Sequence, residues 1–144
     1  MKVALIEGPL LDRLGEREPE VYGSGFTRQD VVEKLKEKAS DLGVEIEFFS
    51  SYSEGTLAQI IADCNADGIV INPGAYTHTS VLLRDSLQYA SIPFVEAHFS
   101  NIFKREEFRR RSFISDIAKG VICGFGVSTY GLALEAISDH LSQD

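Results

Sequence analysis

Short apolar runs alternate along the chain with longer stretches in which apolar and polar residues are mixed. The apolar runs are rich in β-branched residues, as is typical of strands buried in a parallel sheet, and they cover residues 3–6, 44–49, 68–71, 94–97 and 121–124. In the mixed stretches the apolar residues recur every three or four positions, which predicts helices at residues 27–42, 53–65, 81–90 and 129–141. The chain is therefore expected to alternate between strands and helices.

This alternation predicts an α/β fold built on a five-stranded parallel sheet. Each crossover between parallel strands is right-handed and covers one face of the sheet, so we expect a doubly wound, flavodoxin-like fold with strand order 2-1-3-4-5. The run at residues 44–49 begins with alternating polar and apolar positions, which suits a strand at a sheet edge. Residues 1–144 contain no linker-like tract, so they are expected to form a single domain.

Residues 10–26 lack any sustained hydrophobic period. Glycine, proline and charged residues dominate this stretch. Loops of this length inside a compact domain are usually functional. We therefore expect residues 10–26 to form a lid over a site at the edge of the sheet.

Tyrosine, histidine, arginine and amide side chains gather in three predicted loops, at residues 17–23, 72–80 and 96–101. Ligands of open α/β sheets bind beyond the carboxyl ends of the strands, so we expect these loops to converge on one site. The basic run at residues 104–111 continues the third loop and can offer guanidinium groups to a carboxylate. Together these residue types indicate a small, polar, anionic ligand.

Each candidate side chain also has a purely structural interpretation. His78 can simply cap a helix that starts near Thr79 or Ser80, Tyr22 can be a packing aromatic, and the arginine run can be the solvated face of a helix. His98 is the strongest candidate, because Glu96 precedes it by two positions and can orient its ring for acid–base chemistry.

Composition narrows the partners and the compartment. A formal net charge of −8 argues against a nucleic-acid partner, because binding a phosphate backbone needs a basic surface. The apolar runs are far shorter than the roughly 20 residues that span a bilayer, and the first residues read as a strand instead of a signal peptide, so a cytoplasmic protein is expected. Cys64 and Cys123 have no zinc-site or CxxC spacing, which predicts two buried free thiols and no metal.

Several motifs, in order and over essentially the whole chain, resemble those of type II 3-dehydroquinate dehydratases. They are Gly8-Pro9, Arg17-Glu18-Pro19, Tyr22-Gly23, Asn72-Pro73, Tyr76-Thr77-His78-Thr79-Ser80, Arg84-Asp85, Glu96 with His98, Ser100-Asn101-Ile102, Arg105-Glu106-Glu107-Phe108-Arg109 and Gly120-Val121-Ile122-Cys123-Gly124. The resemblance implies a hydro-lyase of the shikimate or quinate pathway. It converts 3-dehydroquinate to 3-dehydroshikimate by anti elimination through an enolate, without cofactor or metal, and it assembles as a homododecamer, a tetramer of trimers.

The resemblance also implies a role for each matching residue. Tyr22 matches the base that takes the C2 proton, and Arg17 matches the lid arginine that helps to keep the tyrosine ionised. His98, oriented by Glu96, matches the acid that protonates the departing hydroxyl. The matches to substrate-binding residues are Asn72, His78, Ser100, Ile102, Arg109 and Asp85, the last supplied by a neighbouring subunit.

The first loop departs from the family pattern. The family usually has Asn-Gly-Pro-Asn where this chain has Glu7-Gly8-Pro9-Leu10. The second of those asparagines helps to hold a water against the enolate oxygen, and losing such a stabiliser typically costs about 10²–10³ in rate. The departure leaves two alternatives to the dehydratase: an enzyme for a related cyclic hydroxy-ketone acid, or a catalytically impaired binding paralogue.

Overall fold

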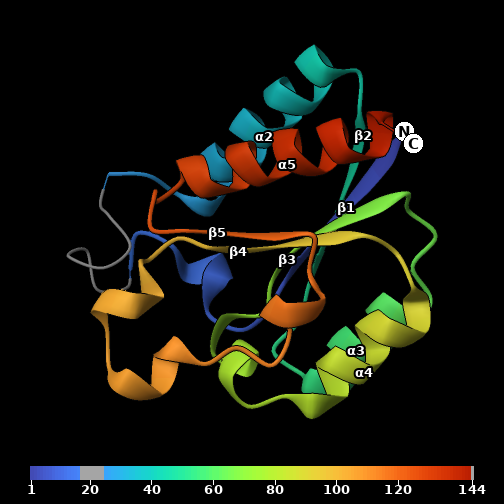
Figure 1. Cartoon of the computed structure of the whole chain (residues 1–144). Helices are drawn as coiled ribbons and strands as arrows, with labels where there is room; N and C mark the ends of the chain where they lie inside the picture. Colours follow the sequence, from blue (N-terminus) through green and yellow to red (C-terminus); the bar gives the residue numbers. More distant parts are fainter. Residues whose placement is uncertain (17–24, 144) are drawn as a thin grey trace.

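The computed structural model describes residues 1–16 and 25–143 and contains one parallel sheet. Its strands are β1 (Lys2–Glu7), β2 (Glu45–Ser50), β3 (Gly68–Asn72), β4 (Phe94–His98) and β5 (Gly120–Cys123). All neighbouring pairs are parallel, and the order β2-β1-β3-β4-β5 confirms the predicted topology (Figure 1). The switch in strand order between β1 and β3 brings their carboxyl ends together, at the place where ligands bind in such sheets.

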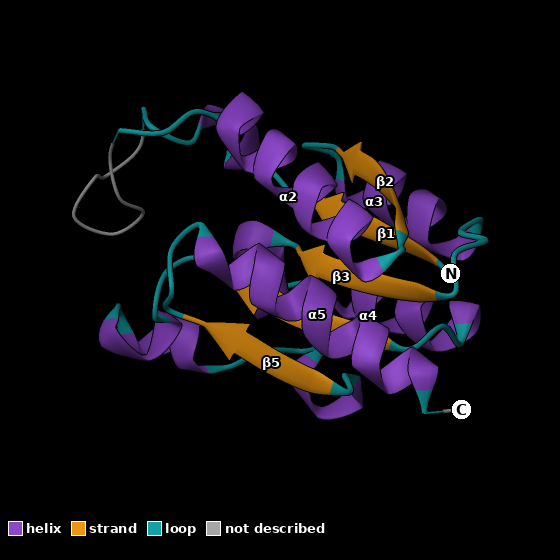
Figure 2. Ribbon diagram, turned by 90° about the horizontal axis from the view of Figure 1, so that it is seen from above, coloured by secondary structure: helices purple, strands orange, loops and turns teal. Residues whose placement is uncertain are grey.

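Helices cover both faces of the sheet. Helices α2 (Arg28–Leu42) and α5 (Ser128–Ser142) lie on one face, whereas α3 (Glu54–Ala62) and α4 (Val81–Ala90) lie on the other (Figures 1 and 2). Successive strand residues point to opposite faces, so β1 contributes Val3 and Leu5 to the core under α2 and α5, and Ala4 and Ile6 to the core under α3 and α4.

Local capping chemistry sets the helix starts. Thr27 and Asp30 form a complete capping box at the start of α2, and Gly43 ends this helix in the left-handed conformation. Ser80 is the N-cap of helix α4, and its hydroxyl accepts a hydrogen bond from Leu83 N, so Thr79 is not the cap. Ser53 caps α3, which ends at Ala62, three residues before the predicted end at Asn65.

Three sequence expectations need correction. The stretch at residues 10–26 was expected to be a loop without regular structure, but Leu11–Arg13 form the 3-10 turn η1, and Leu11 and Leu14 are buried in the core beneath α2. Strand β5 lies at a sheet edge and is partly exposed instead of buried. The prediction of buried thiols is wrong because Cys64 and Cys123 are both only half-buried.

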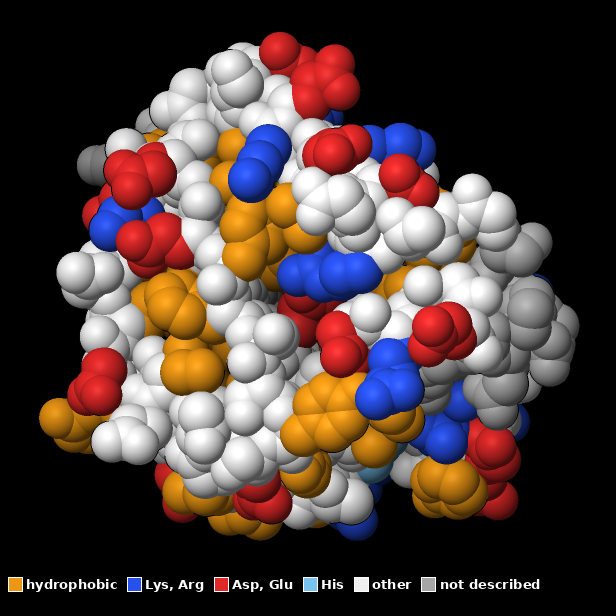
Figure 3. Space-filling model, turned by 180° about the vertical axis from the view of Figure 1, so that it is seen from behind, with side chains coloured by type: hydrophobic (Ala, Val, Ile, Leu, Met, Phe, Trp, Pro, Cys, Tyr) orange, Lys and Arg blue, Asp and Glu red, His pale blue; other side chains and the backbone are white. Residues whose placement is uncertain are grey.

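One face of the surface carries mixed charges. On the face shown in Figure 3, acidic side chains lie among Lys and Arg side chains and small hydrophobic areas. Among the described residues, no helix is both long and apolar enough to cross a membrane.

Candidate active site

A cavity of about 200 Å³ lies at the carboxyl ends of β1, β3 and β4. Six of the residues expected to bind or transform a ligand line it: Asn72, His78, His98, Ser100, Ile102 and Arg109. A larger cavity of about 360 Å³ lies between β2 and α3, but neither His78 nor His98 lines it. The candidate catalytic and binding side chains therefore line the smaller cavity, at the sheet edge where the topology predicts a site.

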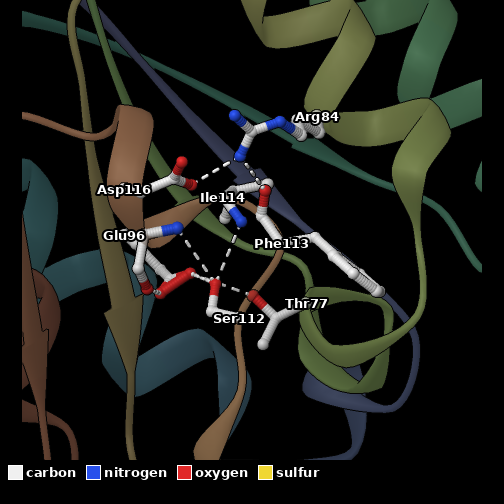
Figure 4. A network of polar contacts seen from close by, with 8 residues as sticks. Thr77, Arg84, Glu96, Ser112, Phe113, Ile114 and Asp116 are labelled. Carbon is white, nitrogen blue, oxygen red and sulfur yellow. Dashed lines mark hydrogen bonds and ion pairs between the residues drawn. The ribbon is translucent and has the colours of Figure 1, made fainter.

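Glu96 and His98 project from the same face of β4, because residues two apart on a strand share a face. Glu96 is fully buried, and its Oε2 lies 3.5 Å from His98 Nε2, an electrostatic contact longer than a hydrogen bond. Three hydroxyl groups donate to the same carboxylate: Thr77 at 3.1 Å, Ser112 at 2.5 Å and Ser115 at 2.5 Å. Figure 4 shows Thr77 and Ser112 converging on Glu96.

These contacts keep Glu96 charged. Burial alone would raise the pKa of Glu96, but His98 and the hydroxyl groups of Ser112 and Ser115 outweigh burial and lower this pKa below its usual value of 4.5. A buried carboxylate beside one ring nitrogen orients the imidazole toward the cavity that His98 lines. The arrangement therefore suits His98 as a proton donor.

His78 lies on the other side of the cavity. Its ring stacks near that of His98, with 6.5 Å between the ring centroids and 14° between the planes. Burial lowers the pKa of His78, and the nearby His98 and Arg109 add to this effect against the Arg111 carbonyl. A neutral His78 donates from Nδ1 to the Arg111 carbonyl oxygen at 2.7 Å, which leaves Nε2 as an acceptor for a ligand hydroxyl. Because Ser80 caps α4, the alternative in which His78 merely caps that helix is wrong.

Asn72 ends β3 and is almost fully buried. Its Oδ1 accepts from Gly74 N at 3.1 Å, and its Nδ2 donates to the Tyr130 hydroxyl at 3.0 Å. Tyr130 belongs to α5 and was not expected at the site, because its apolar neighbours and helical spacing indicate only a core aromatic. Its hydroxyl was a sequence signal, but Thr129 and Ser138 of the same helix carry buried hydroxyls as well.

The first loop packs directly against the loop after β3. Gly8 N donates to the Asn72 carbonyl oxygen at 2.8 Å, and a Cβ on Gly8 would lie 2.2 Å from the Pro73 carbonyl oxygen. Only glycine fits at this close approach. The packing brings Leu10 to the cavity wall, where its backbone adopts the left-handed conformation with φ 70°.

Two guanidinium groups give the cavity a positive side. Arg109 of η4 (Glu107–Arg110) lines the cavity and pairs with Glu106 at 2.5 Å. Arg105 also lines it and approaches Ser100 Oγ at 3.4 Å, although the sequence interpretation did not select this residue. The basic run is thus partly solvated, as one alternative proposed, while two of its members reach the cavity.

One expected substrate-binding residue is not brought to this cavity. Asp85 lies exposed on α4 and does not line the cavity of its own chain. Arg17 and Tyr22 lie outside the described residues. Within residues 1–16 and 25–143, no group of three His, Cys, Asp or Glu side chains is arranged to hold a metal ion.

Comparisons with known proteins show which family the chain resembles. The family model for dehydroquinase class II matches residues 1–138. A 3-dehydroquinate dehydratase from Prochlorococcus marinus (strain NATL1A) is 50% identical over 145 residues, covering 99% of this chain and 99% of that protein.

Two crystal structures show that the similarity extends to the three-dimensional fold. A type II dehydroquinase from Butyrivibrio crossotus DSM 2876 is 38% identical and superimposes with a TM-score of 0.88, covering 99% of this chain and 97% of the other. One from Propionibacterium acnes is 36% identical with a TM-score of 0.89, covering 96% of each chain. The family model and a relative that is 50% identical both match nearly the whole length of this chain. The chain therefore belongs to the class II dehydroquinase family.

Proposed function

We propose that this protein converts 3-dehydroquinate to 3-dehydroshikimate by eliminating water. The observation that carries the proposal is the buried Glu96–His98 pair, which faces a cavity bordered by Arg105 and Arg109. An elimination needs an acid for the departing hydroxyl and a positive group for the substrate carboxylate, and this cavity offers both. Relatives that share half of the sequence bear the name 3-dehydroquinate dehydratase.

In the proposed reaction, a base removes the C2 proton and the electron pair forms an enolate. Collapse of the enolate then breaks the bond to the departing hydroxyl, which takes a proton from His98 and leaves as water. Tyr22 is proposed as the base from the family resemblance. The unperturbed pKa of a tyrosine, about 10, must fall by about three units for the side chain to act as a base near neutral pH. This needs roughly 4 kcal/mol of phenolate stabilisation, and Arg17 is proposed to contribute to it.

The polar groups of the cavity suit a hydroxylated carboxylate. Arg109 is proposed to hold the carboxylate, while Asn72 offers an N–H donor and His78 offers a nitrogen acceptor to ring oxygens. Ser100 adds a hydroxyl, and buried Ile102 adds an apolar wall. This combination of one anion site with separate donors and acceptors favours an acid that carries several hydroxyl groups over a purely apolar ligand.

The proposed assembly is the homododecamer of the resemblance, with Asp85 serving a neighbouring subunit. This fits the place of Asp85 on α4, whose Val81, Leu82 and Tyr89 are also exposed, at 54%, 46% and 77%. Apolar groups on an exposed helix face favour burial against another chain. A cytoplasmic location is proposed because Cys64 and Cys123 are free thiols, as is usual in a reducing compartment.

The test is the enone absorbance that develops when purified protein is mixed with 3-dehydroquinate. We expect turnover in the wild type, and the Tyr22→Phe variant should lose nearly all of it while its affinity for the substrate stays within about tenfold. A wild type that binds the substrate without turnover would instead be the impaired binding paralogue. Turnover of only another cyclic hydroxy-ketone acid would establish the second alternative.

A further inference from the structure

Glu7 is a buried carboxylate that the proposed reaction does not use. It ends β1, is 1% exposed and lies directly opposite Asn72 in the pairing of β1 with β3. Its Oε1 forms an ion pair with Arg28, the first residue of α2, without an aligned hydrogen bond. Its Oε2 accepts a hydrogen bond of 2.7 Å from the Tyr130 hydroxyl, which in turn accepts from Asn72.

The direction of each hydrogen bond in this chain follows from its neighbours. A backbone N–H can only donate, so Gly74 N fixes Oδ1 as the Asn72 atom that faces it. Asn72 Nδ2 must then donate to Tyr130, and the Tyr130 proton is left for Glu7. Burial and the neighbouring Glu7 charge raise the pKa of Tyr130 well above its usual value, so its hydroxyl keeps the proton that it donates.

We propose that Glu7 is a positioning residue that acts through Tyr130 to hold the Asn72 amide with an N–H directed at a ligand oxygen. The inference rests on the proposed function, in which Asn72 binds a substrate hydroxyl. Asn72 Nδ2 carries two hydrogens, and the hydrogen bonds among the described residues use one of them. Asn72 lines the cavity, so the second hydrogen is available to an acceptor there.

The polarity of the amide determines which ligand atom it selects. With Nδ2 at the cavity, Asn72 favours an acceptor oxygen, whereas a reversed amide would favour a donor and would leave Gly74 N unpaired. A tyrosine hydroxyl can donate in either direction, so the tyrosine alone does not fix this polarity. The Gly74 N–H requires this polarity from one side, and Glu7 supports it from the other, because an ionised carboxylate can only accept.

The pKa of Glu7 is raised above its usual value, chiefly by burial, so its role as an acceptor depends on a counter-charge. Burial raises the pKa of Glu7 and the Asp12 charge on η1 adds to this, while Arg28 of α2 and Tyr130 of α5 oppose it. The guanidinium group of Arg28 is therefore the counter-charge on which the acceptor role of Glu7 depends. Tyr130 also packs against Phe99 with ring centroids 4.3 Å apart, a contact that phenylalanine would retain.

The test compares Glu7→Gln and Tyr130→Phe with the control Glu135→Gln. Glu7→Gln replaces an obligate acceptor with a group that can also donate, and Tyr130→Phe removes the link while keeping the ring. Glu135 pairs with Lys38 at 2.6 Å and so joins the same two helices, α2 and α5, outside the cavity. We call the hydrogen-bonded chain from Glu7 through Tyr130 to Asn72 the relay. Thermal unfolding identifies which variants are folded, and one folded variant, either Glu7→Gln or Tyr130→Phe, is sufficient for the test.

Two readouts are measured: kcat and KM with 3-dehydroquinate, and the NMR signals of the Asn72 side-chain amide without ligand. Both relay variants should raise KM about tenfold to hundredfold with a smaller change in kcat, because the contact binds the substrate and not only the transition state. Both should also shift the Asn72 amide signals. The double variant should be no worse than Tyr130→Phe, and Glu135→Gln should resemble the wild type in both readouts.

A folded relay variant with unshifted Asn72 signals overturns the inference, and so does one with shifted signals and a wild-type KM. If the effects of Glu7→Gln and Tyr130→Phe on KM are fully additive in the double variant, the inference is also overturned, because Glu7 would then act independently of Tyr130. The proposed function fails separately, if the wild type does not dehydrate 3-dehydroquinate. The Asn72 signals then decide alone whether Glu7 positions the amide.

Discussion

At the scale of single residues, Leu10 has both an unfavourable backbone and an unsuitable side chain. It adopts φ 70° at the cavity wall, a conformation that costs an ordinary residue about 1–2 kcal/mol and that asparagine tolerates better. We predict that Leu10→Asn increases stability by about 0.5–1 kcal/mol, measured by denaturant unfolding. It should also raise turnover by about one to three orders of magnitude if the added amide stabilises the enolate through a water.

Leu10→Gly is the matched control for this prediction. Glycine relieves the same backbone strain but adds no amide, so it separates the conformational effect from the chemical one. Turnover that rises equally in Leu10→Gly and Leu10→Asn would show that the amide has no role. Turnover unchanged in both, in a wild type that already acts rapidly, would mean that other donors stabilise the enolate.

Glu96 makes a pH-dependent contribution to stability. Its pKa in the folded state is lowered from 4.5, so its stabilising effect is fully present above the unfolded-state pKa and is lost as the pH falls through the folded-state pKa. We predict that Glu96→Gln lowers the free energy of unfolding by about 1–3 kcal/mol at pH 7. The difference from the wild type should shrink steadily below pH 4.5, as followed by urea unfolding at several pH values.

The same variant tests the orienting role of Glu96. Glu96→Gln should lower turnover less than His98→Ala does, because it loosens the imidazole without removing it. A destabilisation that stays constant down to pH 3 would contradict the proposed charge on Glu96. A variant His98→Ala that changes only KM would show that the acid lies elsewhere.

At the scale of elements, the connection between β4 and β5 depends on side-chain contacts more than on regular structure. It contains the 3-10 turns η3 (Ile102–Lys104), η4 and η5 (Ser115–Ile117). Arg84 of α4 holds its second half by donating to the Phe113 carbonyl oxygen at 2.8 Å and to Asp116 at 2.5 Å (Figure 4). This segment positions Ser112 and Ser115 on Glu96, so Arg84 supports the site from a distance.

We therefore predict that Arg84→Met lowers turnover about threefold to tenfold, because small displacements of supporting groups are costly in catalysis. Asp116→Asn removes only the ion pair and leaves the bond to the Phe113 carbonyl, so its effect should be smaller. Steady-state kinetics and thermal unfolding of both variants provide the measurement. Equal losses in the two variants would assign the support to the ion pair alone, and no loss in either would refute it.

The elements also show where a single sequence is informative. Three helices have an N-cap whose side chain accepts a hydrogen bond from the first turn: Thr27, Ser53 and Ser80. Because this capping is local in sequence, these helix starts could be predicted. Strand β5 was expected to be buried because its run is apolar, although the predicted strand order already placed it at an edge. The turns between β4 and β5 have no helical period, and the long-range contacts that hold them cannot be inferred from spacing.

The candidate site likewise contains residues that the sequence predicts and a residue that it does not. Asn72, His78 and His98 were predictable because each follows or ends an apolar strand, and parallel strands share one carboxyl edge. Tyr130 was missed because it is 58 positions from Asn72 and lies on a helix whose period indicates only packing. Its proposed role depends on a tertiary contact between α5 and the ends of β1 and β3.

At the scale of the whole molecule, the cavity of one chain lacks Asp85, which lies exposed on α4. If a neighbouring subunit supplies Asp85, one site combines residues of two chains. Two inactive variants, Asp85→Ala and Tyr22→Phe, should then restore activity when they assemble together. Random mixing in equal amounts gives about a quarter of the sites an intact Tyr22 from one chain and an intact Asp85 from the next.

We predict recovery to about a quarter of wild-type turnover after the two variants are mixed in denaturant and refolded together. The control pair is His98→Ala with Tyr22→Phe, whose residues are proposed to belong to the site of one subunit, so mixing should restore nothing. Light scattering checks that both mixtures assemble to the same size. Full activity of Asp85→Ala alone would remove this residue from the reaction, whereas assembled mixtures without recovery would place Asp85 and Tyr22 on the same subunit of each site.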